Sequence, residues 1–329
     1  MIPPLRHLAL IQPRVGIGDM IWHLPHIRAL ARHAGGRVTL VTRRRSMADQ
    51  FMDAADGIDH IFWVERGQWD QGGRHEGAAG MVRLVRELRA LGCDGAVLMT
   101  RSRTLTLAVL GMGVRHRHGY GIGGQRRLLH GPFLPRSLWR VHPYDQATAW
   151  MAAAGIALDR PDPVLHVTGA QRDAAAARLG PTPSTVGTVA LGIAASDDWK
   201  NWGAERFAAL ARTLLARGHA IVLVGGPAEQ GIADAILAGI APGATSLALG
   251  WPLRQLAALL ANCALYVGND TAALNMAAAV GTPSVGLFGG TAPLRHSPLI
   301  RPVLPPGGID RDHGMARITP DMVLAALPS

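Results

Sequence analysis

Cysteine is nearly absent from this chain of 329 residues, which contains only Cys93 and Cys263. The two stand far apart and lack the paired spacing of metal-binding cysteines. Their scarcity excludes a disulfide framework and a zinc knuckle, and it fits a reducing compartment, so we expect a cytoplasmic protein. The first residues contain only a short apolar run, which predicts a strand at 7–13 and no secretory signal.

Charge is missing from residues 271–294, a length that matches a membrane-spanning helix. Glycines and prolines interrupt this stretch repeatedly, so it is expected to form a helix, a turn and a strand instead. A hydrophobic content of 48% is ample for buried cores, and the chain length predicts two domains.

Aromatic residues make up only 5% of the chain, and no recognised nucleic-acid-binding module is present. Residues 1–165 contain 22 arginines against 13 acidic residues, whereas residues 166–329 are nearly balanced. Such an excess favours an anionic partner: nucleic acid, acidic lipid or a phosphorylated glycan. Nucleic acid has only the charge in its favour and is not predicted. A solvated arginine-rich surface without a partner is the other alternative.

Lysine occurs once, at Lys200, among 33 basic residues. Arginine is a planar fork, whereas lysine is a compact point charge. A chain that uses arginine everywhere else is expected to need a lysine at this position. Chance retention of one lysine is the alternative.

Short β-rich runs alternate with helical patterns, which predicts βαβ units and parallel sheets. In the first half, strands are expected at 7–13, 37–43, 60–64 and 95–100, and helices at 26–34, 46–54, 79–91 and 145–154. The helix at 145–154 is expected to begin at Asp145 as its N-cap. In the second half, strands are expected at 186–195, 220–226, 245–250, 264–270 and 283–290, and helices at 203–218, 228–239, 253–263, 272–281 and 318–327.

The predicted fold class is therefore α/β, with two Rossmann-like, doubly wound domains that face a central cleft. The domains are expected at residues 1–165 and 166–329, joined through the proline-containing segment 155–185. The last helix is a candidate for packing back on the first domain.

A Gly-x-Gly turn in the segment RVGIGDMIWHLP, residues 14–25, leads to Asp19. Glycines let the backbone turn tightly and let a ligand approach. Asp19 fits two roles. It can cap the following helix, or it can act as a general base at the carboxyl end of a strand.

Lys200 lies in the segment SDDWKNWGAERF, which follows a predicted buried strand. A cation in this loop is expected to face the cleft, with Trp199 and Trp202 fixing the loop by packing. Ser196 is a candidate hydroxyl donor in the same loop. The alternative for Lys200 is an exposed salt bridge to a neighbouring aspartate, worth about 0–1 kcal/mol.

Two further strand ends in the second half carry acidic residues. Glu229 follows a Gly-Gly turn at a helix start, where the helix dipole alone favours a carboxylate. Its other interpretation is a contact to vicinal sugar hydroxyls. Asp270 and Thr271 precede an alanine-rich helix whose first amides, from Ala272 and Ala273 onward, form an open anion site. Close helix–sheet packing also selects alanine.

Fourteen histidines are present, but none has convincing metal-ligand spacing. His116 and His118 alternate with Arg115 and Arg117, whose charges disfavour a bound cation. No metal site is predicted.

Together these segments resemble glycosyltransferase family 9, the heptosyltransferases of lipopolysaccharide core assembly. The resemblance rests on GDMIWHLP, SDDWKNW, GGPAE and NDTAALNMAAAVGTPSVGLFGGTAP, of which the last is the most specific. It implies a GT-B fold and an enzyme that needs no metal or other cofactor. The implied reaction moves a sugar, most often heptose, from a nucleotide-diphosphate donor, typically ADP-heptose, with inversion. The acceptor is a lipopolysaccharide-core or other cell-envelope glycan.

The resemblance also implies roles for matching residues. Asp19 matches the general base, Lys200 the lysine that neutralises the donor diphosphate, and Glu229 the residue that holds the ribose. Asp270 matches the acid near the donor sugar. The remaining implied donor contacts are Ser196, Thr271, Ala272, Ala273 and Asn275.

The resemblance implies a binding function for the arginine-rich first half, because the family's first domain holds a phosphorylated, lipid-linked glycan at the inner membrane face. A monomer with peripheral membrane contact is expected. The polar segment 65–77 is expected to be an acceptor-side loop. The candidate acceptor contacts are Arg115, Arg117, Arg126, Arg127, Arg136 and Arg140.

Two positions depart from the family pattern. Ala272 stands where the family has glycine, and Asn275 stands where it has histidine. Asparagine donates and accepts hydrogen bonds but carries no proton charge near neutral pH. These departures motivate the alternative hypothesis of a catalytically degenerate member that binds glycans or acts as a scaffold.

Overall fold

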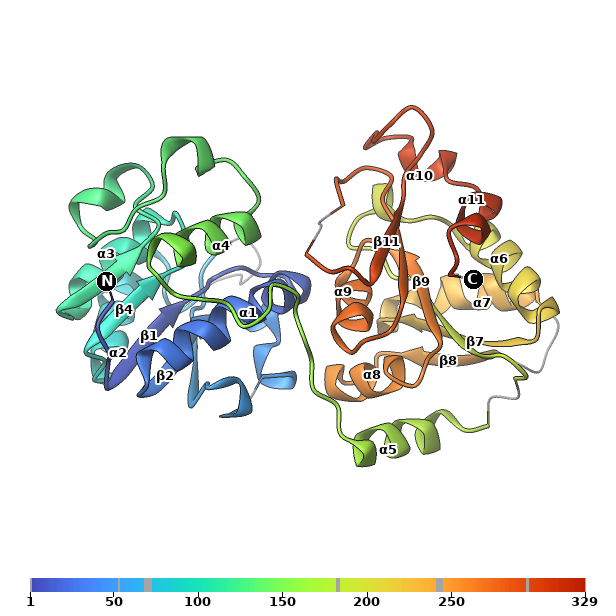
Figure 1. Cartoon of the computed structure of the whole chain (residues 1–329), viewed down its shortest axis with the longest axis horizontal. Coiled ribbons are helices and arrows are strands. Elements are labelled where there is room, and N and C mark those ends of the chain that lie inside the picture. Colours follow the sequence, from blue (N-terminus) through green and yellow to red (C-terminus); the bar gives the residue numbers. More distant parts are fainter. Residues whose placement is uncertain are drawn as a thin grey trace. The chain divides into compact units, whose positions relative to one another are not determined.

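A computed structural model describes residues 2–52, 54–67, 73–181, 184–240, 245–293 and 296–328. The chain divides into two compact units, Met1–Pro161 and Asp162–Ser329. Each contains one parallel sheet with helices packed on it (Figure 1). The expected connecting segment is in part an element of the second unit, since α5 (Gly169–Leu179) contacts α8 (Leu253–Leu260).

The sheet of the first unit has the order β3-β2-β1-β4-β5 among the described residues, and its strands are β1 (His7–Ile11), β2 (Arg37–Thr42), β3 (His60–Trp63), β4 (Gly95–Leu98) and β5 (His116–Gly119). Every pair is parallel. The helices are α1 (Ile17–Ala34), α2 (Gly77–Ala90), α3 (Arg103–Met112) and α4 (Pro143–Ala153). Short 3₁₀ turns occupy Arg44–Ser46, Ala48–Gln50, Ala54–Asp56, Gly123–Arg127 and Arg136–Leu138.

The chain turns back beside β1 in the first unit, so its helices cover both faces of the sheet. Right-handed crossovers place α1 on one face and α2 and α3 on the other. The contacts agree, because α1 packs with α4 and α2 packs with α3. Leu84 and Leu88 of α2 and Ala108 of α3 join the core under the sheet.

The sheet of the second unit has the order β11-β10-β9-β6-β7-β8 among the described residues, and its strands are β6 (Gly187–Gly192), β7 (His219–Gly225), β8 (Thr245–Leu249), β9 (Leu265–Asn269), β10 (Ser284–Leu287) and β11 (Ile300–Val303). It too is parallel throughout. Besides α5 and α8, the helices and 3₁₀ turns are α6 (Ala204–Ala216), α7 (Gln230–Ala238), α9 (Ala272–Ala279), α10 (Gly314–Arg317), α11 (Pro320–Ala325), Asp198–Lys200 and Pro227–Glu229.

The core of the second unit is built from buried strand residues and from Trp202, Phe207 and Leu210. One close approach requires glycine. An ideal Cβ on Gly192 would lie 1.7 Å from the hydroxyl of Tyr266, which is buried beneath the end of β6. Glycine at position 192 therefore leaves the space that the Tyr266 hydroxyl occupies.

Several expected boundaries differ from the structure. The helix expected at 46–54 is wrong, because 3₁₀ turns occupy this segment and Met47 has a left-handed φ of 48°. The helix expected from 26 begins at Ile17 and includes Pro25. The N-cap expected at Asp145 is His142, whose Nδ1 accepts from the Tyr144 amide at 3.2 Å.

The last helix, α11, packs against α6 of its own unit, and Val323 belongs to that unit's core. Among the described residues, no helix combines the length and apolar character needed to cross a membrane.

Candidate functional site

Each sheet reverses its strand order beside its first strand. In the first unit the reversal lies between β1 and β4, and in the second it lies between β6 and β9. Ligands of open α/β sheets bind outside the carboxyl ends of strands at such a reversal. The residues that follow these four strands are therefore the candidates for function.

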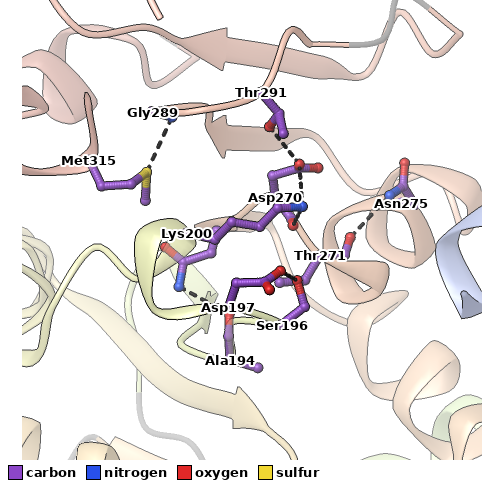
Figure 2. Close-up of polar contacts among 11 residues, drawn as sticks. Ala194, Ser196, Asp197, Lys200, Asp270, Thr271, Asn275, Gly289, Thr291 and Met315 are labelled. Carbon is purple, nitrogen blue, oxygen red and sulfur yellow. Dashed lines mark hydrogen bonds and ion pairs between the residues drawn. The ribbon is translucent and has the colours of Figure 1, made fainter. Parts of the chain in front are cut away.

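Lys200 and Asp270 meet at the reversal of the second sheet. Lys200 ends the 3₁₀ turn after β6, and Asp270 directly follows β9. The ammonium Nζ lies 3.0 Å from Asp270 Oδ2, and both side chains are 19% exposed. Thr291, after β10, donates its hydroxyl to the same carboxylate oxygen at 2.8 Å (Figure 2). Three neighbouring strand ends thus hold one partly exposed cation in place.

Asn269 fixes the loop that carries Lys200. Its buried amide donates to the carbonyls of Ile193 and Ala194 and accepts from the Trp202 backbone amide at 3.2 Å. Trp202 is buried and donates its indole N–H to the Ile318 carbonyl at 2.8 Å. The sequence analysis identified Trp202 as a loop anchor but missed Asn269, because a strand-end asparagine has no motif of its own.

The start of α9 carries no side-chain cap. Thr271 is the N-cap but makes no side-chain capping bond, and its Oγ1 is buried with no partner among the described residues. Ala272 and Ala273 are partly exposed, so their free backbone amides are within reach of an anion. Asn275 is buried and donates to the Thr271 carbonyl at 3.0 Å, so its amide supports the first turn (Figure 2).

Trp199 carries two cations over its ring. Lys200 Nζ lies 5.2 Å and Arg311 Cζ lies 4.7 Å from the ring centroid. Gly290 packs on the ring, since an ideal Cβ there would lie 2.6 Å from a ring carbon. Trp199 therefore helps to set the position of Lys200. Arg311 was missed because it lies outside every motif that we identified.

Glu229 and Ser196 complete the sequence-predicted residues of the second unit. Glu229 ends the 3₁₀ turn after β7, and its Oε2 would lie 2.9 Å from an ideal Cβ on Gly226. The Gly-Gly turn thus makes room for this carboxylate at the carboxyl end of β7. Ser196 is exposed and donates to Asp197 Oδ2 at 2.9 Å.

Asp19 lies in the first turn of α1, after β1 of the first unit. It does not cap the helix, because the N-cap is Gly16, which has no side chain. Asp19 Oδ1 pairs with Arg14 Nε at 2.7 Å, and the two side chains are 21% and 38% exposed. An ideal Cβ on Gly16 would lie 2.7 Å from Asp19 Oδ2, so glycine leaves the space that the carboxylate occupies.

A cavity of about 290 Å³ opens at the reversal of the first sheet. Three arginines and Trp139 are among the residues that line it. Tyr120 is buried and its hydroxyl has no partner among the described residues. Burial raises the pKa of Tyr120, so its hydroxyl remains a hydrogen-bond donor. The polar and aromatic lining comprises Arg14, Thr100, Arg101, Tyr120, Trp139, Arg140 and Gln146.

The histidines near Asp19 are structural. His23 Nδ1 lies 2.7 Å from the Asp19 carbonyl, and His26 Nε2 lies 2.9 Å from the Thr148 hydroxyl. Burial lowers the pKa of His23 to about 4 and that of His26 to about 3. Both are therefore neutral at neutral pH. No group of three or more potential metal ligands occurs in the described part of the chain.

The six predicted acceptor arginines do not form one cluster. Arg140 lines the cavity. Arg126 and Arg136 lie 6.0 and 5.9 Å from the centroid of Trp139. Arg127 is exposed and directly follows Arg126 in the sequence. Arg115 and Arg117 lie at the start of β5, away from the strand's carboxyl end, and Arg117 donates to the Val114 carbonyl at 2.6 Å.

Three other residues that line the cavity, Arg14, Arg101 and Tyr120, were not predicted from the sequence. The predicted acceptor-side loop at 65–77 is partly outside the described residues, which omit 68–72.

Two Rossmann-like units, each with charged residues at the reversal of a parallel sheet, make up a GT-B architecture. The family model of glycosyltransferase family 9 (heptosyltransferase) matches residues 81–303, which is more than half of the chain. The chain belongs to this family, as its motifs predicted.

Two curated relatives share a short segment with the chain. Lipopolysaccharide heptosyltransferase 3 of Escherichia coli is 38% identical over 96 residues, which is 28% of each protein. Lipooligosaccharide heptosyltransferase 2 of Haemophilus influenzae is 33% identical over 104 residues, 30% of each. The matched segments thus span less than a third of these relatives.

Solved structures share the fold along nearly the whole chain. E. coli ADP-heptose lipopolysaccharide heptosyltransferase II has a TM-score of 0.76 at 21% identity, covering 97% of both chains. A family 9 glycosyltransferase from Veillonella parvula has a TM-score of 0.77 at 18% identity, covering 99% of this chain and 97% of that one. These likenesses confirm the predicted GT-B fold.

Proposed function

We propose that the protein is an inverting, metal-independent glycosyltransferase that moves heptose from ADP-heptose to a lipopolysaccharide-core or other cell-envelope glycan. The observation that carries the proposal is the Lys200–Asp270 pair at the reversal of the second sheet, beside the open start of α9. The structurally similar E. coli heptosyltransferase WaaC has been solved with ADP and with ADP-2-deoxy-2-fluoro heptose, which supports this donor class.

The donor diphosphate fits the second unit. A leaving diphosphate gains negative charge as the bond to the sugar breaks, and a fixed cation with a helix start stabilises such charge. Lys200 supplies the ammonium, and the amides of Ala272 and Ala273 supply donors. Asp270, which accepts a hydrogen bond from Thr291, holds the ammonium and stands beside the donor sugar, while Glu229 accepts from the ribose hydroxyls. Since these groups neutralise the diphosphate, the proposal requires no metal.

The acceptor fits the first unit. Asp19 accepts the proton of the acceptor hydroxyl, whose oxygen bonds to the anomeric carbon as the bond from that carbon to the diphosphate oxygen breaks. ADP departs with the electron pair, and attack from the opposite face inverts the anomeric centre. We assign the cavity lined by Arg14, Arg101 and Arg140 to an acidic group of the acceptor. The setting is the cytoplasmic face of a membrane that carries the acceptor lipid.

The test is a thermal-shift titration with ADP and ADP-heptose in the presence of EDTA. Both ligands are expected to raise the melting temperature, and Lys200→Ala is expected to remove most of the shift. Arg172→Ala, which removes an exposed charge on α5, is the matched control and should leave the shift intact. A melting curve that ADP-heptose does not move, or a shift that vanishes with EDTA, would contradict the donor or metal assignment respectively.

A second candidate is a degenerate family member that binds glycan without transfer. Asn275 favours it, because the buried amide is bonded to the helix backbone. This candidate predicts an ADP-heptose shift but no ADP release with any glycan acceptor. Release of ADP that requires both Lys200 and an acceptor would eliminate it.

A further inference from the structure

Helices α2 and α3 share an exposed surface of unusual composition. Val82 on α2 is 69% exposed, and Leu107 and Leu110 on α3 are 52% and 40% exposed. The exposed charged residues of the two helices are all arginines. We call this surface the α2–α3 face, and it consists of Val82, Arg83, Arg86, Arg89, Arg103, Leu107 and Leu110.

The spacing places these residues on one stripe of each helix. Arg103, Leu107 and Leu110 follow the i, i+4, i+7 pattern on α3, and Val82, Arg86 and Arg89 follow it on α2. The opposite side of each helix is buried in the core, and on α2 this side includes Leu84 and Leu88. An exposed stripe therefore runs along each helix, and its apolar residues lie outside the core.

The two stripes lie side by side. Gly111 of α3 touches Val85 of α2, because an ideal Cβ on Gly111 would lie 2.8 Å from a Val85 methyl carbon. Both helices return between parallel strands and therefore run in the same direction. Val82 is one turn before Val85, and Leu107 is one turn before Gly111, so Val82 and Leu107 stand at the same level on adjacent helices.

No exposed acidic side chain offsets the arginines on these helices, both of which are described along their whole length. Glu87, the acidic residue of α2, is partly buried and bonded to His75 at 3.0 Å and to Arg74. Arg86, Arg89 and Arg103 make no ion pair with a carboxylate among the described residues. Four arginines with three apolar side chains therefore face solvent.

We propose that the α2–α3 face docks on an anionic lipid bilayer. Apolar side chains enter the boundary of the headgroups, and arginines spread their apolar stems and guanidinium groups among lipid phosphates. A second copy fits poorly, because a two-fold contact of this face would oppose arginines to arginines. Nucleic acid gains little from three exposed aliphatic side chains.

The face continues into the proposed acceptor cavity. Arg101 lines the cavity, and α3 begins two residues later at Arg103, with Ser102 as its cap. A lipid-linked acceptor held at the face would present its polar head to the cavity. This link rests on the proposed function, whereas docking on lipid does not require it.

The experiment is co-sedimentation of the full chain with vesicles of phosphatidylcholine alone or mixed with phosphatidylglycerol, without donor or acceptor. We expect binding only to the mixed vesicles. Arg86→Glu with Arg89→Glu should weaken that binding about tenfold or more, since each basic residue near an anionic surface adds substantially to the attraction. Val82→Ser with Leu107→Ser should weaken it several-fold at unchanged charge.

The controls are Val186→Ser, a 57% exposed valine of the second unit, and Arg172→Glu on α5; both should bind as the natural chain does. Because all substituted side chains are exposed, melting temperature and the ADP-induced shift should be unchanged in every variant. Failure of that shift would count against the proposed function and not against lipid docking. Absence of phosphatidylglycerol-dependent binding, equal binding by both double variants, or a dimer that both double variants dissociate would overturn the inference.

Discussion

Asp19 and Lys200 are each held in place by an ion pair with one residue of opposite charge. Arg14 lies 2.7 Å from Asp19, and Asp270 lies 3.0 Å from Lys200. Both pairs are partly exposed, so each adds only about 0–1 kcal/mol to stability. Their value is in position, because a base and a cation act only when they meet the reacting atoms at a defined distance. Substitutions here should therefore affect activity far more than stability.

Asp19→Asn tests the base at this scale. The amide keeps the shape of the side chain but does not accept a proton, so transfer should fall about 10²–10⁴-fold. The measurement is ADP release at saturating donor and acceptor. The ADP-induced melting shift should persist, because Asp19 belongs to the first unit. Near-normal turnover in Asp19→Asn would remove the residue from the mechanism.

Some residues of the candidate sites could be predicted from the sequence, and others could not. Lys200 stood out because it is the only lysine, and Asp270 and Thr271 stood out because a polar pair separates a strand from an alanine-rich helix. Asn269, Thr291 and Arg101 gave no such signal. Asn269 ends β9, Arg101 follows β4 and Thr291 follows β10, so what each lies beside depends on strand order, which is a property of long-range pairing.

At the scale of elements, several apolar runs were predicted correctly as strands, whereas the apolar helix α3 and the polar strand β5 were not predicted. The strand expected at 37–43 is β2, and the strand expected at 220–226 is β7. β5 was missed because its sequence is HRHG, although His118 is buried there and burial lowers its pKa. Pairing with β4 makes this polar segment a strand, and local propensity does not predict that pairing.

Helix α1 gives the first unit a dependence on pH. His26 is neutral when folded, because burial lowers its pKa to about 3, whereas the unfolded chain takes up the proton near its ordinary value of 6.5. Acid therefore favours the unfolded state, and stability should fall as pH drops below 6.5. One such proton contributes a slope of about 1.4 kcal/mol per pH unit.

The measurement is the melting temperature between pH 7 and pH 5. His26→Gln should show a shallower decline than the natural chain, while His166→Gln, at an exposed histidine, should match the natural chain. Parallel declines in all three proteins would show that His26 is not the group responsible.

At the scale of the whole molecule, the chain is two units with separate cores and the same plan. Each has a parallel sheet that reverses beside its first strand, and each places charges at that reversal. The sequence predicted the α/β fold and the family, because strand–helix alternation and the motifs extend along most of the chain. The arginine-lined cavity was not predictable, since its lining comes from three strand ends, the segment after a 3₁₀ turn and the start of α4, which only folding brings together.

Hydrogen exchange of the full chain tests the division of labour between the units. ADP should slow exchange around Lys200, the start of α9 and Thr291, and leave the segment of β1 and Asp19 unchanged. The Lys200→Ala chain with ADP is the control and should show little protection. Protection centred on the first unit would contradict the assignment of the nucleotide site to the second unit.

The scarcity of lysine has a practical consequence for chemistry on this protein. An amine-selective reagent meets one side-chain target in 329 residues, and that target is the ammonium beside Asp270 and Thr291. Covalent probes, crosslinkers and isotope labels of this kind will therefore report on this one side chain of the second unit and on the α-amino group, without the background that a lysine-rich surface would give.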